Sequence, residues 1–235
     1  MGPRCAYGWL SIPSLDKSIW DGVSPWLSIP LVLLAIDFAD YWVHRLMHVS
    51  KWAWPIHAVH HSDPHPTALT VGRVHLLEAV LMQMTYLLLL AWLSLPYEVL
   101  GGVAGLRVLH NMYIHIDVDW DHGPLKYLIA SPRYHRWHHA DEPKAYGKNL
   151  ANLFPFYDVL FGTYYMPGTC RIAPGAQGVP TRALEMVAWP LLVWARLLQP
   201  RRARQNETGV SAGSEDSPEP GEGNGTVRPI VSGVA

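Results

Sequence analysis

The sequence predicts an all-α membrane protein, a helical bundle with about three to four membrane-embedded helices and a cytoplasmic, histidine-rich helical cap. Three observations predict this fold class. The chain of 235 residues is 49% hydrophobic but only 16% charged, which is a low charged share for a soluble domain. Apolar runs of membrane-spanning length are present. Most of the 13 histidines lie between or after these runs.

Two apolar runs are long enough to cross a bilayer, whose core of roughly 30 Å takes about 20 helical residues. They are residues 26–43 and 76–95, and a weaker third run covers 97–116. Pro96 lies between the second and third runs, so we expect a turn there that makes them a helical hairpin. Within the third run, Gly101 and Gly105 have GxxxG spacing, which either allows close helix packing or is a chance match.

The remaining segments give the domain boundaries. Residues 183–199 are apolar but include Glu185, Pro190 and Arg196, so we expect this segment to lie in the membrane interface rather than to span it. Residues 201–204 are basic, and from about residue 205 the Gly, Ser, Pro and Glu content predicts a disordered tail. We therefore divide the chain into an N-terminal segment (1–25), a membrane domain (26–200) and a tail (201–235).

Counting membrane crossings places all the histidine clusters on one face. The first span ends at His44 and His48, and the hairpin crosses the membrane and returns, which brings residues 57–61, 110–115 and 134–139 to the same side. The opposite side has only Arg4 and Lys17 near its helix end. The positive-inside rule therefore predicts that the histidine face is cytoplasmic. The cations on that face are Arg45, Lys51, Arg73, Lys126, Arg133, Arg136, Lys144 and Lys148.

The histidines have the spacing of metal ligands. His44 and His48 are four residues apart, so they share one face of a helix. Residues 57–61 and 135–139 each have the pattern HxxHH, which lets a single helical turn present three ring nitrogens to one region. One such pattern alone has packing as a plausible explanation, but two of them together with HxxxH favour a metal site. The eight candidate ligands are His44, His48, His57, His60, His61, His135, His138 and His139.

The number and type of these ligands restrict the metal. Eight imidazoles exceed the tetrahedral set of one zinc, so two ions fit better, and imidazole suits iron, zinc, copper or nickel. Cys5 and Cys170 are far apart and outside any CxxC, which argues against a thiolate site. At about 100° per residue, Asp37 and Asp40 lie within roughly 60° of the His44 stripe. We expect both acids to accept N–H hydrogen bonds from metal-bound imidazoles.

Five segments resemble the fatty acid hydroxylase / sterol desaturase superfamily of membrane di-iron oxygenases in their order and spacing. The segments are DFADYWVHRLMH, HAVHHS, GRVHLLE, GPLKYLIASPRYHRWHH and NLANLFPFYDVLFGTYYMP, and the resemblance covers roughly residues 36–167. It implies a membrane bundle, a cytoplasmic di-metal centre held by histidines, and O2-dependent hydroxylation or desaturation of a lipid.

The resemblance also assigns further residues. The eight box histidines match its metal ligands, and His115 matches an additional histidine, with His110 as a weaker match. The family often has Asn where this chain has Asp117, so Asp117 is expected to alter local hydrogen bonding beside the site. Polar residues of the terminal motif, Asn149 and Asp158, have either a folding or a catalytic role. Residues with a possible site-facing or substrate-facing role are Arg73, His75, Glu78 and Trp137.

The predicted enzyme uses two iron ions, with zinc as a substitute in purified protein, and O2 as co-substrate. Its partners are a lipid, the membrane and a separate electron donor, a ferredoxin or a cytochrome with its reductase, because the chain has no GxGxxG or other recognisable redox module. A homodimer is a further expectation. The alternatives are a zinc-dependent lipid hydrolase, which the absence of HExxH and GxSxG disfavours, and a non-catalytic metal-binding membrane protein.

Overall fold

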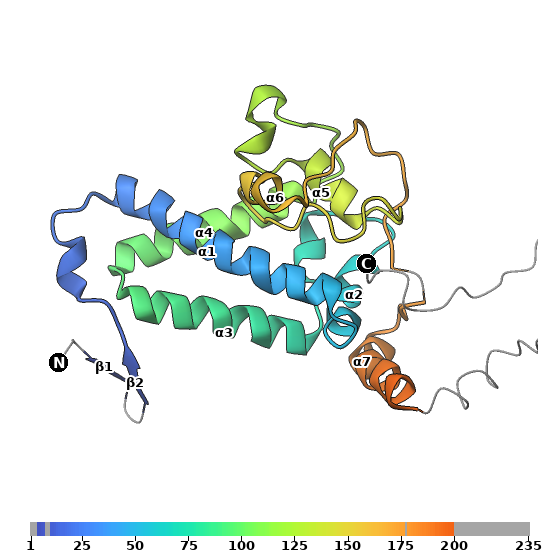
Figure 1. Ribbon diagram of the computed structural model, residues 1–235, viewed down its shortest axis with the longest axis horizontal. Helices are drawn as coiled ribbons and strands as arrows, with labels where there is room; N and C mark the ends of the chain where they lie inside the picture. The colour runs from blue at the N-terminus through green and yellow to red at the C-terminus, as the bar shows by residue number, and fades with distance from the viewer. Residues whose placement is uncertain (1–3, 8–9, 177, 200–235) are drawn as a thin grey trace, which may run out of the picture.

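Three long helices lie side by side, and the histidine-rich segments gather at one end of them (Figure 1). The computed structural model describes residues 4–7, 10–176 and 178–199, so the predicted tail lies outside the described residues. The long helices are α1 (Pro25–Val49), α3 (Leu76–Leu93) and α4 (Tyr97–Ile114). α1 packs against both α3 and α4 and is the central helix of the three. α1 and α4 run toward the histidine end, whereas α3 runs away from it.

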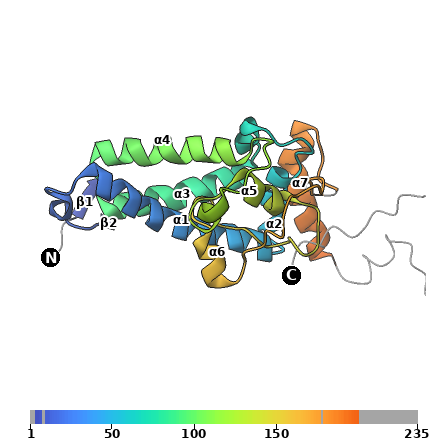
Figure 2. The same ribbon diagram turned by 90° about the horizontal axis from the view of Figure 1, so that it is seen from above.

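Shorter elements complete the chain. α2, α5 and α6 form a cap over the histidine end, and α7 lies beside this end (Figures 1 and 2). Their bounds are Trp54–His61 for α2, Pro132–His139 for α5, Phe156–Phe161 for α6 and Ala183–Leu198 for α7. Three 3-10 helices are η1 (Lys17–Trp20), η2 (Ala68–Gly72) and η3 (Gly123–Tyr127). The helical class is thus confirmed, with one exception: β1 (Arg4–Tyr7) and β2 (Leu10–Pro13) form an antiparallel hairpin that an all-α reading misses.

The turn between α3 and α4 lies where Pro96 predicts it. α3 ends at Leu93, and Ser94 has a left-handed backbone with φ 50°, which reverses the chain. Pro96 then precedes the first residue of α4. The close approach in this region involves Gly102, because a Cβ atom there would lie 2.6 Å from Cδ1 of Ile29 on α1. A Cβ atom at Gly101 or Gly105 would meet nothing within 4 Å, so the GxxxG pair makes no packing contact in the described structure.

The core between the long helices is apolar and continuous. It contains a stripe of α1, the end of α3 and the first turns of α4, and these side chains pack at the end of the bundle opposite the histidines. If these helices lie in lipid, van der Waals packing of these side chains holds them together, because lipid tails are as apolar as the side chains themselves. The buried members are Val32, Leu33, Ile36, Leu93, Leu95, Val99 and Val103.

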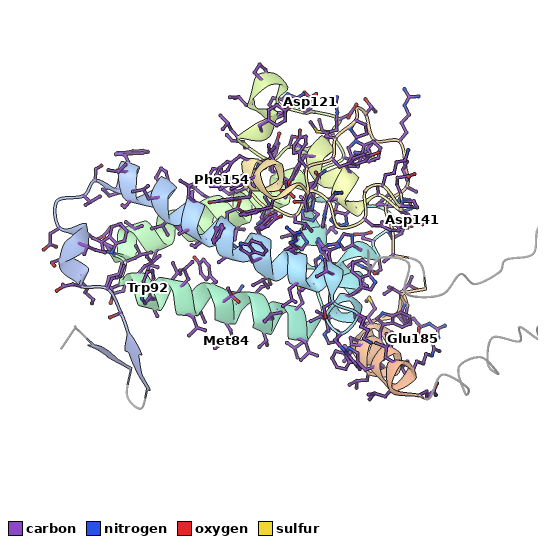
Figure 3. The ribbon with its side chains drawn as sticks, in the orientation of Figure 1. Met84, Trp92, Asp121, Asp141, Phe154 and Glu185 are labelled. Atoms are coloured by element: carbon purple, nitrogen blue, oxygen red, sulfur yellow. The ribbon has the colours of Figure 1, made fainter. Side chains whose placement is uncertain are left out.

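Two helices, α1 and α3, are long and apolar enough to cross a membrane. Only 17% of the spanning window of α3 is buried within the protein, so α3 is not the core helix of a soluble domain. Large apolar side chains of α3 point away from the cap, with Met84 among them (Figure 3). α4 does not meet the same criteria, so a third crossing, and the cytoplasmic location of the cap, stay predictions.

α7 runs across the direction of the three long helices rather than along it (Figure 2). Its Trp189 and Val193 pack on Val59 of α2. On the opposite side, Leu184 and Leu191 are exposed. This orientation fits the expectation that residues 183–199 lie in the membrane interface, which stays a prediction.

Candidate metal centre

Four parts of the chain bring their histidines to the same end of the bundle. His44 and His48 come from the last turns of α1, and His115 follows α4 directly. α2 and α5 are single short helices of eight residues, and each presents the HxxHH pattern. α5 begins at a capped N-terminus, where the Ser131 hydroxyl accepts a hydrogen bond from the backbone N–H of Tyr134. Side chains crowd the space between α1, α2 and α5 (Figure 3).

The nine histidines form two groups, and in each group the candidate ligand atoms all lie within 4.8 Å of one another. The first group has five members and the second has four. Every member is buried except His44, which is half-buried. The first group is His44, His48, His57, His61 and His138, and the second is His60, His115, His135 and His139.

Hydrogen bonds fix the protonation of several rings. In the first group, His44 Nδ1 donates to the carbonyl oxygen of Leu150 at 2.7 Å, and His57 Nδ1 lies 2.8 Å from Oε1 of Glu78, which accepts from it as a carboxylate. A neutral imidazole that donates from Nδ1 has a lone pair on Nε2. The two Nε2 atoms nevertheless lie 3.0 Å apart. Two facing lone pairs at this distance repel each other unless a cation lies between or beside them.

In the second group, one ring is fixed in the same way. His115 Nδ1 donates to the carbonyl oxygen of Asn111 at 2.6 Å, which leaves a lone pair on its Nε2. That Nε2 lies 3.0 Å from Nε2 of His135 and 3.3 Å from Nε2 of His60. His139 adds a fourth Nε2, 3.0 Å from that of His135. Four imidazole nitrogens therefore converge on one point.

Buried ring nitrogens without a hydrogen-bond partner support metal binding by the first histidine group. Buried polar atoms in native proteins nearly always have a partner, and one without a partner calls for an ion or a water. Of the first group, His48 Nε2 and His138 Nε2 have no hydrogen-bond partner, although Nδ1 of His138 donates to the carbonyl oxygen of Lys148 at 2.9 Å. An all-imidazole set of this size fits a pair of transition-metal ions.

Burial keeps these rings neutral. Burial, with a smaller contribution from the neighbouring His115, lowers the pKa of His60 to about 3. Burial, followed by the nearby histidines, lowers the pKa of His57, His61, His135, His138 and His139 well below the usual value. A metal binds the neutral imidazole, so the rings are in the binding form at pH 7 without having to lose a proton.

The acids expected beside the histidines have other partners, so that expectation was wrong. Asp37 accepts the backbone N–H groups of Asn152, Leu153 and Phe154 at 3.1, 2.8 and 2.7 Å. Asp40 forms an ion pair with Arg107 at 2.5 Å. The helical stripe places both acids on the correct side of α1. It does not reveal the loop 150–154 or α4, which supply donors nearer to the carboxylates than any histidine.

Asp117 also lies away from the rings. Its side chain is 80% exposed and pairs with Arg136. Among the described contacts, it makes none to a candidate ligand. Glu78 is an acid that contacts a candidate ligand, since it accepts a hydrogen bond from His57. Glu78 thus has the role that the sequence assigned to Asp37 and Asp40.

The structure places the other candidate site residues outside the two histidine groups. His75 caps the N-terminus of α3, where its Nδ1 accepts from Leu77 N, and its Nε2 lies 3.1 Å from the carbonyl oxygen of Val187. Arg73 donates to the hydroxyl of Ser62, and Trp137 donates to the carbonyl oxygen of Gly168. His110 belongs to neither histidine group and lines a small cavity with Asp37 and Arg107.

The loop 148–154 is the main feature that the sequence did not reveal. Its backbone carbonyls hold His44 and His138, and Asp158 orders it by accepting the N–H groups of Leu150 and Ala151 at 2.7 and 2.9 Å. Asn149 has φ 57° and bonds the backbone of Tyr165. Backbone carbonyls leave no residue signal, so only the polar positions Asn149 and Asp158 pointed to this loop.

A cavity of about 420 Å³ reaches the second histidine group from outside. His115, His135 and His139 line it, whereas no member of the first group does. Its other walls come from the segments 64–67, 114–117, 132–136 and 170–174. Its volume lies within the range of small-molecule sites, about 300–1,000 Å³.

Known proteins similar to this chain are lipid oxygenases by name. Alkylglycerol monooxygenase of Danio rerio is 31% identical over 147 residues, which cover 62% of this chain and 31% of that protein. Ornithine lipid hydroxylase OlsE of Rhizobium tropici is 31% identical over 143 residues, 59% of this chain and 42% of that protein. Methylsterol monooxygenase 1-1 of Arabidopsis thaliana is 28% identical over 139 residues, 54% of this chain and 43% of that protein.

The match covers less than half of each of these relatives, and no solved structure matches the chain. The two apolar helices, together with these relatives, indicate a membrane protein. The Fatty acid hydroxylase family model matches residues 29–163, which run from α1 past α6 and include all nine clustered histidines. Because this match covers more than half of the chain and confirms the resemblance drawn from the motifs, the protein belongs to the fatty acid hydroxylase family.

Proposed function

We propose that this protein is a membrane-bound di-iron oxygenase that hydroxylates a lipid with O2 and external electrons. The observation that carries the proposal is the convergence of nine imidazoles, eight of them buried and His44 half-buried, on two points, with Nε2 atoms of different rings 3.0 Å apart in each group. In this proposal the first group holds one ion and the second group holds the other. The names of the relatives, monooxygenases and a hydroxylase of lipids, support hydroxylation over desaturation.

Iron suits the proposed reaction better than zinc. Zinc has no redox chemistry and is usually satisfied by four ligands, whereas five imidazoles converge in the first group. Two iron ions in these groups would supply the reduction of O2 and the oxidation of an unactivated C–H bond. In the balanced reaction, one oxygen atom enters the C–H bond and the other leaves as water, with two electrons and two protons taken up.

The residues of the chain orient the ligands and control access. Leu150, Lys148 and Asn111 accept from Nδ1 of His44, His138 and His115, and Glu78 accepts from His57. These bonds keep each Nε2 unprotonated and fix the direction of the ring. Burial of both groups excludes bulk water, while the cavity gives access to the second group.

Several parts of the proposal concern partners. The electrons come from a separate ferredoxin or cytochrome system, because the sequence has no recognisable redox module of its own. The histidine end faces the cytoplasm in this proposal, where such donors are present. A second copy of the chain would complete a bundle that has only two clear spans among the described residues.

Lipidomics of cells with and without the protein tests the reaction. The proposal predicts a lipid whose mass increases by one oxygen atom when the protein is present and O2 is supplied. A matched cell line expressing the His138→Ala variant should lack this product, because the variant removes a ligand of the first group. Release of a fatty acid by ester cleavage that continues without O2 would favour a hydrolase instead.

A further inference from the structure

The cavity beside the second histidine group has buried side chains at its bottom and charged side chains at its mouth. Ile114 and the three lining histidines of the second group, His115, His135 and His139, are at most 6% exposed, so they lie at its bottom, whereas the fourth lining histidine, His65, is exposed. Arg171 is exposed, and the Asp117 side chain is 80% exposed, so these residues lie at the mouth. A cavity with this distribution suits an amphiphile, with its polar part at the mouth.

The mouth has an excess of positive charge. Two guanidinium groups, Arg136 and Arg171, line it against one carboxylate, Asp117. Asp117 pairs with Arg136. Among the described residues, Arg171 makes no ion pair, so its five N–H donors are available. Guanidinium groups bind the oxygens of phosphate and carboxylate groups with paired hydrogen bonds.

The volume limits how much of a lipid fits. At about 420 Å³, the cavity lies in the lower half of the range for sites of drug-sized molecules, about 300–1,000 Å³, so it takes a polar head and a short stretch of chain rather than a complete long-chain lipid. A lipid anchored at the mouth can therefore place only its first carbons beside the histidines. The C–H bonds nearest to His115, His135 and His139 are those close to the polar head.

We infer that this cavity binds the anionic head of the lipid substrate, a phosphate or carboxylate, through Arg136 and Arg171. The first carbons of the chain then lie against the second histidine group, so oxidation takes place near the head. This inference rests on the proposed function, because it takes the second group to be part of the oxidising centre.

Binding of octyl phosphate to the metal-loaded, full-length protein in dodecyl maltoside tests the inference. Equilibrium dialysis compares it with inorganic phosphate, which has the head alone, and with octyltrimethylammonium, which has the same chain and a cationic head. We expect octyl phosphate to bind more tightly than either. Equal binding of inorganic phosphate would overturn the lipid assignment, and equal binding of octyltrimethylammonium would overturn the anionic one.

Two charge-neutralising variants make the test specific to the mouth. Arg171→Gln should weaken octyl phosphate binding about tenfold or more, because it removes a charged hydrogen-bond donor. Lys144→Gln removes an exposed cation that does not line the cavity and should leave binding unchanged. Equal effects of the two variants would overturn the inference. The metal content of each sample separates this result from a failure of the proposed function, which would appear as a wild-type protein that binds no iron.

Discussion

Nε2 of His44 and Nε2 of His57 lie 3.0 Å apart, although hydrogen bonds from Nδ1 leave a lone pair on both atoms. His44 is fixed by the loop 148–154, and His57 is fixed by α3 through Glu78. Two separate parts of the chain, the loop and α3, thus hold two lone pairs against each other. A bound cation explains why such an arrangement is stable, and the predictions below test the residues that maintain it.

Glu78 should control metal binding without touching the metal. Its Oε1 accepts from Nδ1 of His57 at 2.8 Å, and both side chains are buried. Glu78→Leu should therefore lower metal affinity by about 10–100-fold, the usual effect of losing a partner of a ligating histidine. Glu78→Gln retains an acceptor oxygen and should lose less.

Metal titration of the purified variants provides the measurement for Glu78. Glu98→Gln is the control, because Glu98 is exposed in the first turn of α4, at the opposite end of the bundle. Equal metal affinity of Glu78→Leu and the wild type would show that His57 needs no acceptor for its direction.

Asp158 should stabilise the fold rather than the reaction. It is fully buried and accepts from Leu150 N, Ala151 N and the Thr163 hydroxyl. Asp158→Ala leaves these donors without a partner, so we expect a loss of about 2–4 kcal/mol in the free energy of unfolding. Thermal unfolding in detergent measures the change.

The control for Asp158 is Asp21→Asn, at an exposed acid that follows η1. This variant should unfold within about 0.5 kcal/mol of the wild type. An Asp158→Ala protein of unchanged stability but without product would assign Asp158 to catalysis instead.

The Asp40–Arg107 pair should affect the stability of the fold because each charge neutralises the other. Asp40 is 3% exposed, and its carboxylate lies 2.5 Å from the Arg107 guanidinium. Removing one partner of a buried pair leaves an unpaired charge and costs about 3–5 kcal/mol. Arg107→Leu should therefore destabilise the protein by about this amount.

The double variant Asp40→Leu with Arg107→Leu is the informative comparison for this pair. It removes both charges, so it should recover most of the stability that Arg107→Leu loses. Denaturation in detergent compares the three proteins. A double variant as unstable as the single one would mean that the pair provides geometry that apolar side chains do not replace.

Gly102 should tolerate a side chain less well than its neighbour Gly105. A Cβ atom at Gly102 would meet Ile29 at 2.6 Å, whereas one at Gly105 would meet nothing within 4 Å. Gly102→Ala should cost about 1 kcal/mol through overpacking against α1. Gly105→Ala should be neutral or stabilising, because alanine favours a helix. Thermal unfolding of the two variants checks the difference, and the reverse order would contradict the packing of α1 on α4.

The spacing of the histidines indicated which rings share a helical face because that information is local, but it did not predict the two groups, between which each HxxHH is divided. Residues three and four apart share a helical face, so HxxHH on α2 and α5 gives the relative direction of the rings without any knowledge of the tertiary structure. Pro96 similarly predicted the turn between α3 and α4. Features of this kind depend on neighbouring residues alone.

The partners of the histidines could not be predicted in the same way. Asp37 lies on the expected side of α1, yet its carboxylate bonds amides of residues 152–154, more than a hundred residues away in the chain. The acceptors for His44 and His138 are backbone carbonyls, which any residue type supplies. The hairpin of β1 and β2 is likewise short and gave no clear alternating pattern.

The iron content of the purified protein tests the central claim most directly. Protein expressed with iron and purified without oxygen should contain about two irons per chain, with Mössbauer parameters of nitrogen-coordinated ferrous ions. His138→Ala and His135→Ala, one from each group, should each lower the iron content. A wild-type protein that binds less than one iron, or two zincs that iron does not replace, would contradict the account.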